Sequence, residues 1–153
     1  MKVIVIGCTH AGTAAVLNIM KLHPNAEVTV YEKNNNISFL SCGIALYVCG
    51  VVKDQNGLFY CSPNELMELG VKTQMLHEVN QIDFDEKKVH VTNLETNESS
   101  TDTYDKLVIA TGSWPIIPPI EGIYANNVLL SKNFAHSNQI ISKAKDVKKI
   151  TVV

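Results

Sequence analysis

The spacing of hydrophobic residues changes along this chain, and each change predicts a different element. Within residues 2–6, four β-branched apolar side chains follow Lys2 without interruption, which is typical of a strand buried on both faces of a parallel sheet. From 12 to 23 the apolar residues recur at helical spacing until Pro24, and 27–31 again read as a strand. This succession predicts a βαβ unit of about 30 residues, and hence an α/β fold with a Rossmann-like, doubly wound parallel sheet.

Alternation of polar and apolar residues covers the middle of the chain. Three alternating segments predict an antiparallel three-stranded insertion over residues 71–104, and they span 71–82, 87–93 and 98–104. Residues 106–110 are again mostly apolar, as in the first strand, and predict another buried strand. The pattern over 134–145 predicts a helix. Residues 149–153 predict the beginning of another strand. We therefore expect one domain over residues 1–148, followed by the start of a second.

Two shorter helices are predicted between the βαβ unit and the insertion. Ser62 and Glu65 have the spacing of a capping box with Pro63 at the first helical position, and Gly70 closes that helix. Ser41 is placed as the cap of a second helix, over Cys42 to Val48.

Composition and charge narrow the possible partners. The chain has 153 residues, of which 46% are hydrophobic, enough for a single core. Its 13 basic and 15 acidic residues give a net charge of -2, which provides no positive field to hold a nucleic acid. The apolar stretches are far shorter than the ~20 residues of a membrane span, and the run after Lys2 is too short for a secretory signal. We expect neither a nucleic-acid partner nor a membrane.

The cysteine spacing argues against metal and disulfide frameworks. The four cysteines, Cys8, Cys42, Cys49 and Cys61, include no Cys-x-x-Cys pair, so no zinc or other metal site is predicted. Unpaired thiols are typical of a reducing compartment, and a cytoplasmic location is expected.

A glycine-containing turn joins the first predicted strand to the first predicted helix. The segment Gly7-Cys8-Thr9-His10-Ala11-Gly12 lies where the dinucleotide fingerprint Gly-x-Gly-x-x-Gly belongs, with Thr9 in place of the central glycine. Gly7 would permit a tight turn, Gly12 would allow close packing of helix on strand, and the free amides at the helix start would hold a pyrophosphate. The alternative is a turn that uses glycine only for its geometry.

Glu32 stands at the end of the second predicted strand, 25 residues after Gly7. An acidic side chain near this offset accepts hydrogen bonds from ribose hydroxyls and repels a 2′-phosphate. The alternative is an exposed glutamate at a strand end, with no ligand.

Cys42 is the candidate reactive thiol. At the first turn of a helix it would lie at the positive end of the macrodipole, which favours the nucleophilic thiolate. On one helix, Cys42 and Cys49 would be separated by about 10.5 Å of rise, beyond the ~7 Å limit for a disulfide. Cys42 would then react without a local partner, forming a sulfenic acid or a mixed disulfide. The alternative is a small buried cysteine with no chemical role.

Taken together, these segments resemble a known family. The Gly-x-x-His-x-Gly turn, Glu32, the Ser-Phe-Leu-Ser-Cys-Gly segment at 38–43 and Ala110-Thr111-Gly112 are similar to the FAD domain of the single-cysteine pyridine nucleotide-disulfide oxidoreductases. That group includes water-forming NADH oxidases, NADH peroxidases and coenzyme A-disulfide reductases. The resemblance covers essentially all 153 residues. The residues of these segments are most similar to those of the NADH oxidases.

The resemblance implies FAD as the cofactor and assigns residues to it. Cys42 corresponds to the redox cysteine beside the flavin, which cycles between thiolate and sulfenic acid, and His10 corresponds to the active-site histidine. An imidazole at a helix N-terminus is biased toward its neutral form and can exchange protons, although a surface histidine is the alternative. The implied cofactor contacts are Gly7, Cys8, Thr9, His10, Ala11, Gly12, Glu32, Cys42, Val79, Ala110, Thr111, Gly112, Ser113 and Lys132.

In the full-length relatives an NADH-binding domain follows, and residues 149–153 look like its first strand. We expect a parent enzyme, a homodimer or homotetramer, that reduces O2 to water with NADH. For the 153-residue chain alone we expect weak flavin binding and little or no NADH turnover. Peroxide or coenzyme A disulfide is the alternative acceptor. A non-catalytic nucleotide-binding or redox-sensing module is an alternative of another class. The fingerprint alone also fits NAD in place of FAD.

Overall fold

The computed structural model describes residues 1–145 and 147–153, and these form two compact units. The sheet unit comprises Met1–Ser38 and Phe59–Gly112, and the helical unit comprises Phe39–Leu58 with the described residues of Ser113–Val153.

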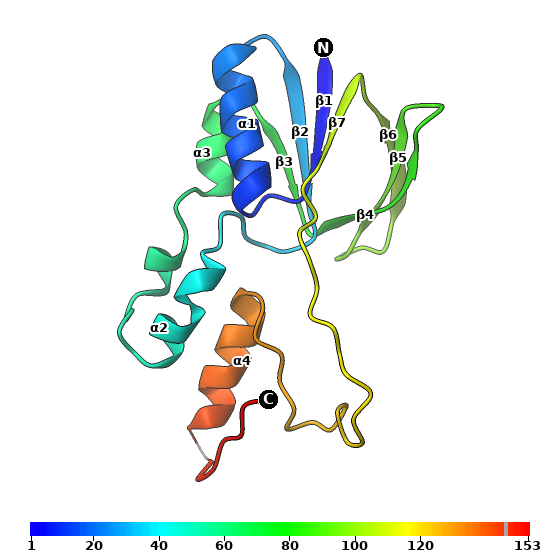
Figure 1. Cartoon of the computed structure of the whole chain (residues 1–153). Helices are drawn as coiled ribbons and strands as arrows, with labels where there is room; N and C mark the ends of the chain where they lie inside the picture. Colours follow the sequence, from blue (N-terminus) through cyan, green and yellow to red (C-terminus); the bar gives the residue numbers. More distant parts are fainter. Residues whose placement is uncertain (146) are drawn as a thin grey trace. The chain divides into compact units, whose positions relative to one another are not determined.

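A four-stranded parallel sheet with the strand order β3-β2-β1-β7 organises the sheet unit. Its strands are β1 (Lys2–Ile6), β2 (Glu27–Glu32), β3 (Lys72–Met75) and β7 (Lys106–Ile109). The helices α1 (His10–Leu22) and α3 (Pro63–Glu68) cover one face of this sheet, as Figure 1 shows. The predicted βαβ unit is confirmed, because β1 and β2 pair in parallel and α1 connects them.

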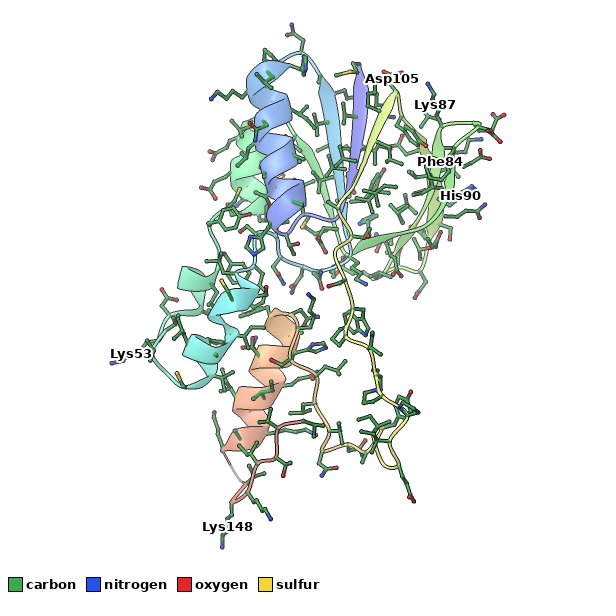
Figure 2. All side chains as sticks on the ribbon, in the orientation of Figure 1. Lys53, Phe84, Lys87, His90, Asp105 and Lys148 are labelled. Atoms are coloured by element: carbon green, nitrogen blue, oxygen red, sulfur yellow. The ribbon has the colours of Figure 1, made fainter. Side chains whose placement is uncertain are left out.

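The second face of the parallel sheet is covered by strands. Here β4 (His77–Asp83), β5 (Lys88–Asn93) and β6 (Ser99–Thr103) form an antiparallel sheet in the order β4-β5-β6 (Figure 1). The predicted three-stranded antiparallel element is therefore present. Phe84, which is labelled in Figure 2, lies in the β4–β5 turn and is 66% exposed.

Alternation along β1 divides the core into two clusters. Val3 and Val5 pack toward α1 and α3 with Val16 and Leu66. The neighbouring side chains of β1 pack on the opposite face with residues of the antiparallel sheet, forming a cluster of Ile4, Ile6, Tyr31, Val89, Val91 and Tyr104. Burial on both faces explains why β1 reads as an unbroken apolar run.

Polar contacts also join the two sheets. Asp102 on β6 accepts a hydrogen bond of 2.9 Å from the Tyr31 hydroxyl and forms an ion pair of 2.5 Å with Lys2. Burial, followed by the hydrogen bond to Asp102, raises the pKa of Tyr31 above its ordinary value. This phenol therefore remains a hydrogen-bond donor throughout the physiological range.

The predicted boundary of the insertion is wrong. The segment 71–82 is not one strand: it divides into β3, which belongs to the parallel sheet, and β4, which begins at His77. Between them Leu76 has a φ of 57°, in the left-handed region, and a strand cannot continue through it. The Leu76 amide donates to the Asn34 carbonyl and its carbonyl accepts from Leu94, so the break is stabilised by hydrogen bonds on both sides.

The helical unit contains α2 (Ile44–Val48), α4 (Phe134–Ala144) and two 3-10 turns, Ser41–Gly43 and Gln55–Leu58. The Phe134 ring lies 5.7 Å from that of Phe39 and 6.4 Å from that of Tyr47, between ring centroids. Asn133 caps α4, where its side chain accepts from the His136 amide. The predicted helix over 134–145 is therefore confirmed to within one residue.

Two expectations for the helical unit are wrong. Ser41 caps no helix: it begins a 3-10 turn without a side-chain cap, and α2 starts only at Ile44 and has five residues. The predicted strand at 149–153 is also absent, because these residues are exposed and pair with no strand in the described parts of the chain. A β-branched run needs a hydrogen-bonding neighbour to become a strand.

Candidate functional site

The turn between β1 and α1 requires glycine at two positions. Gly7 has a φ of +85°, and a Cβ atom there would lie 2.5 Å from the Ala110 carbonyl oxygen. A Cβ on Gly12 would lie 1.9 Å from the Gly7 carbonyl oxygen. The expected geometric roles, a tight turn at Gly7 and close packing at Gly12, are therefore confirmed. Nucleotide binding by this turn stays a prediction.

The N-terminus of α1 has no acceptor from its own sequence. Thr9 is the N-cap residue, yet its side chain makes no cap hydrogen bond, and the first turn contains no acidic residue. The other site residues of this turn, His10 and Ala11, are the first two residues of the helix and are exposed. Amides at such an end point toward solvent and carry the positive pole of the helix. The arrangement suits an anionic ligand such as a pyrophosphate.

Glu32 lies next to this turn and is buried, with 3% of its surface exposed. One carboxylate oxygen, Oε2, accepts a hydrogen bond of 2.7 Å from the Cys8 amide. The other, Oε1, accepts from the Asn34 amide at 2.9 Å and from its side chain at 2.6 Å. The alternative of an exposed glutamate is therefore wrong. Three donors offset the cost of burying this carboxylate.

Cys8 contributes its main chain to the site, because its side chain is enclosed. The thiol is fully buried, and its Sγ lies 3.4 Å from the Thr13 hydroxyl. Burial raises the pKa of Cys8 to about 11, so this cysteine stays a thiol and is a poor nucleophile. Its amide, in contrast, connects the turn to Glu32.

A third segment of the sheet edge meets the turn. Ala110 directly follows β7, and its amide donates to the Ile6 carbonyl at 2.8 Å. Thr111 and Gly112, which has a φ of +70°, continue from it. The carboxyl ends of β1, β2 and β7 thus bring together the turn, Glu32 and Ala110-Thr111-Gly112. In open α/β sheets ligands bind at this edge.

Val79 has a different environment from the other predicted cofactor residues. It lies on β4, pairs with Val91 and packs against the core cluster of the antiparallel sheet. The structure thus accounts for Val79 as a core residue, and its predicted cofactor contact stays a prediction.

Sequence reasoning missed one residue at this site. The Tyr60 ring stacks on the His10 imidazole, with centroids 5.7 Å apart and planes 8° apart. No motif contains Tyr60, which precedes the capping box of α3, and only the fold brings it to His10.

The remaining predicted residues belong to the helical unit. Cys42 lies in the Ser41–Gly43 turn and is an exposed, free cysteine, as is Cys49. The expected placement of Cys42 in the first turn of an α-helix is wrong, because α2 begins only at Ile44. Lys132 donates a hydrogen bond of 3.2 Å to the Ser113 hydroxyl, so two of the predicted cofactor residues meet.

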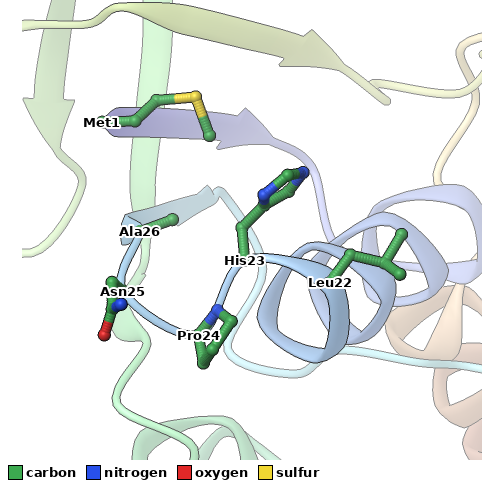
Figure 3. Close-up of a pocket in the computed structure, with 6 residues that line it drawn as sticks. All are labelled: Met1, Leu22, His23, Pro24, Asn25 and Ala26. Atoms are coloured by element: carbon green, nitrogen blue, oxygen red, sulfur yellow. The ribbon is translucent and has the colours of Figure 1, made fainter.

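One surface hollow lies away from the glycine turn. It is lined by Met1 and residues 22–26, at the end of α1 and the beginning of β1 (Figure 3). These elements meet the turn at their opposite ends, so the hollow is not part of the candidate site. Among the described residues, no group of three or more histidine, cysteine or acidic side chains could hold a metal ion. Nor does that part of the chain contain a helix with the length and apolar character of a membrane span.

Comparisons with known proteins agree with this geometry. The model of the pyridine nucleotide-disulphide oxidoreductase family matches residues 1–153. An NADH oxidase of Enterococcus faecalis is 61% identical over 100% of this chain, which covers 34% of that protein. A coenzyme A disulfide reductase of Staphylococcus epidermidis is 30% identical over 73% of this chain and 26% of its own length.

Among solved structures, the water-forming NADH oxidase from Lactobacillus brevis bound to NADH is 56% identical, with a TM-score of 0.93. That match covers 95% of this chain and 32% of the other. The chain thus spans about a third of the length of the curated NADH oxidases that it matches.

Proposed function

We propose, because this chain belongs to the pyridine nucleotide-disulphide oxidoreductase family, that it forms the FAD-binding part of a flavin-dependent NADH oxidase. The full-length protein would reduce O2 to water with NADH in the cytoplasm. The identity of 61% to an NADH oxidase along the whole chain supports this choice within the family.

The observation that carries the cofactor proposal is the pairing of an uncapped helix with a buried carboxylate. The amides at the start of α1 would hold the pyrophosphate of FAD, since no side chain of the turn occupies them. Glu32, whose carboxylate accepts a hydrogen bond of 2.7 Å from the Cys8 amide, would also accept a hydrogen bond from a ribose hydroxyl. Gly7 and Gly12 would keep the backbone free of side chains where the ligand approaches. These residues fit a dinucleotide, and the resemblance of the sequence segments to FAD domains favours FAD over NAD.

Once bound, FAD would supply the acceptor of a hydride from NADH and the donor of electrons to the oxidant. The chain's own residues would handle protons and peroxide. His10, exposed at the first position of α1, would exchange protons with the reacting oxygen species.

Cys42 would carry the redox step on the protein. Two electrons from NADH and two protons would first convert O2 to hydrogen peroxide. The Cys42 thiolate would then attack one oxygen of the peroxide, which forms a sulfenic acid and releases hydroxide. Two electrons that originate from NADH and two protons would then return the sulfenic acid to the thiol and release water. The exposed position of the free Cys42 thiol supports access by a small oxidant.

The test of this function is the acceptor that the full-length protein consumes. We expect two NADH to be oxidised for each O2, without accumulation of peroxide. Cys42→Ser should end the formation of water and leave FAD bound, whereas Cys49→Ser, at the other exposed cysteine, is the matched control. NADH oxidation that leaves O2 untouched in the full-length protein would contradict the proposal.

Coenzyme A-disulfide reduction is a second candidate, favoured by the relative from Staphylococcus epidermidis. In that reaction the Cys42 thiolate would attack the disulfide, form a mixed disulfide and release one coenzyme A thiol. Supplying O2, peroxide or coenzyme A disulfide in turn decides among the acceptors. Bound FAD with no turnover of any acceptor by the full-length protein would indicate a non-catalytic redox module.

A further inference from the structure

Tyr60 makes two contacts with consecutive residues of the glycine turn. Its ring is stacked on the His10 imidazole at 5.7 Å, with nearly parallel planes. Its hydroxyl donates a hydrogen bond of 3.3 Å to the Thr9 carbonyl. The aromatic ring therefore bridges the residue that precedes α1 and the first residue of that helix.

Tyr60 is itself held by Ser38. The Tyr60 amide donates to the Ser38 hydroxyl at 3.1 Å, and so does the Cys61 amide at 2.9 Å. The same hydroxyl donates to the Cys61 carbonyl at 2.6 Å. Ser38 is fully buried, and its two hydrogen bonds with Cys61 are shielded from water, whereas the one from the Tyr60 amide is partly buried.

Ser38 also returns to the glycine turn. Its amide donates a hydrogen bond of 2.8 Å to the Cys8 carbonyl. Its φ of 57° places a residue other than glycine in the left-handed region, a conformation that persists only when the surroundings determine it. The contacts thus form a closed circuit from Cys8 through Ser38 to Tyr60, and from Tyr60 back to Thr9 and His10.

The imidazole depends on this circuit for its orientation. His10 is exposed, and its ring makes no hydrogen bond to any residue in the described parts of the chain. A free side chain of this kind samples several rotamers. A stacked aromatic ring removes part of that freedom, and a proton-exchanging group misplaced by 1 Å costs about 100-fold in rate.

We propose that Tyr60 is a positioning residue that holds the His10 imidazole for proton exchange, with Ser38 fixing Tyr60 in place. This rests on the proposed role of His10 in the oxidase reaction. The ring, through stacking, orients the imidazole, and the hydroxyl only anchors the ring to Thr9.

The kinetic test uses the full-length enzyme and a double-mutant cycle. Tyr60→Leu should lower kcat about tenfold with little change in the KM for NADH, because the imidazole is misplaced and not removed. Tyr60→Phe, which keeps the ring, should restore kcat to within about twofold of the wild type. In a His10→Gln background Tyr60→Leu should cause no further loss, since a positioning residue acts only through its partner.

Phe84→Leu is the matched control. It makes the same ring-to-leucine change at a side chain that is 66% exposed in the β4–β5 turn (Figure 2). An equal loss from Tyr60→Leu in both His10 backgrounds, or no loss in either, would overturn the positioning role. An unchanged kcat in His10→Gln alone would contradict the proposed catalytic role of His10. The kinetic cycle includes this single variant, so it distinguishes that result from a failure of the positioning role of Tyr60.

A structural readout tests the positioning without any turnover. In the 153-residue chain labelled with 13C at its five histidines, nuclear Overhauser effects should connect the His10 and Tyr60 rings. In the Tyr60→Phe variant these effects should persist between the His10 ring and the phenylalanine ring. In the Tyr60→Leu variant the order parameter of the His10 ring should fall. The other four histidine signals report whether each variant is folded. Absence of the His10–Tyr60 effect in the folded wild type would overturn the proposal even if Tyr60→Leu does not fold.

Discussion

Two helices on the same face of the parallel sheet begin in opposite ways. α3 begins with a complete capping box: the Ser62 hydroxyl accepts from the Glu65 amide at 3.2 Å, and the Glu65 carboxylate accepts from the Ser62 amide at 2.6 Å. α1 begins at Thr9, whose side chain caps nothing, and no acidic residue follows in its first turn. Both helices bury a side chain completely in the same core cluster, Leu66 and Val16 respectively.

The difference separates a helix end that is stabilised by its own side chains from one whose backbone donors stay available to a ligand, as the proposed cofactor site requires. A cap of the kind seen at Ser62 stabilises a protein by about 1 kcal/mol, and α1 forgoes that contribution. In its place the turn has two glycines that exclude any side chain, and Glu32 within hydrogen-bond distance of the Cys8 amide. The uncapped end of α1 is thus the end at which the proposed ligand would bind.

The largest effect is expected from closing the space between turn and helix. Gly12→Ala would place a Cβ 1.9 Å from the Gly7 carbonyl oxygen, so α1 must move away from β1. We expect the free energy of unfolding to fall by about 3 kcal/mol or more, together with loss of FAD binding, as measured by urea denaturation and FAD titration. Gly57→Ala is the control, because its Cβ would meet only Val52 at an ordinary 3.9 Å. Wild-type FAD affinity in Gly12→Ala would contradict the account.

A smaller effect is expected from changing the acid beside the uncapped helix. Glu32→Gln removes the charge and directs an amide toward one of the N–H donors that now contact the carboxylate. We expect FAD affinity to fall about tenfold or more, since hydrogen bonds to charged groups contribute about 1.5–3 kcal/mol. Isothermal titration measures it. Glu27→Gln, at the exposed opposite end of β2, should bind FAD as the wild type does. Equal affinities for all three proteins would remove Glu32 from the cofactor site.

The capped helix should respond in stability alone. Ser62→Ala should lower the free energy of unfolding by about 1 kcal/mol and leave FAD affinity unchanged, because the box serves only α3. Thermal denaturation and FAD titration of the same samples give both values. A loss of FAD affinity that is as large as that of Glu32→Gln would contradict the separation between the two helix ends.

The capping box also predicts a pH dependence. The hydrogen bonds from Ser62 lower the pKa of Glu65 below its ordinary value. A carboxyl group with a lowered folded-state pKa stabilises the fold above its unfolded pKa and loses that effect as the pH falls through the folded one. The difference in melting temperature between wild type and Glu65→Gln should therefore shrink on acidification below the ordinary pKa of a glutamic acid. A difference that grows there would be the wrong sign.

The smallest effect is expected at the N-cap of α1. Thr9→Ala should change the free energy of unfolding by no more than a few tenths of a kcal/mol, because its hydroxyl makes no cap hydrogen bond. Urea denaturation beside Ser62→Ala compares the two caps directly. A loss equal to that of Ser62→Ala would show that α1 is capped after all, and the contrast between the helices would disappear.

Elements with a clear period could be predicted from the sequence. β1 is predicted with its observed bounds, Lys2–Ile6, because strands buried on both faces are continuously apolar. The capping box at Ser62 is likewise a local signal, and the structure contains it. The glycine turn could also be predicted, because only glycine fits at its two glycine positions, where a Cβ would collide with backbone atoms.

The features that sequence reasoning missed depend on tertiary contacts. Leu76 breaks the alternating segment through a left-handed φ, a conformation that is not expected for leucine. Glu32 was predicted as a cofactor residue, but its burial could not be predicted, because Cys8 and Asn34 donate to it from two neighbouring loops. Tyr60 reaches His10 across 50 residues of sequence, and no spacing rule connects them.

The most direct test of the account is the visible absorption spectrum of the purified 153-residue chain, before and after addition of FAD. We expect the spectrum of a protein-bound flavin to appear when FAD is added. Gly12→Ala should weaken this spectrum most, and Glu32→Gln should weaken it less. A folded, colourless chain that takes up no added FAD would contradict the claim that the uncapped end of α1 and the buried Glu32 form a flavin site.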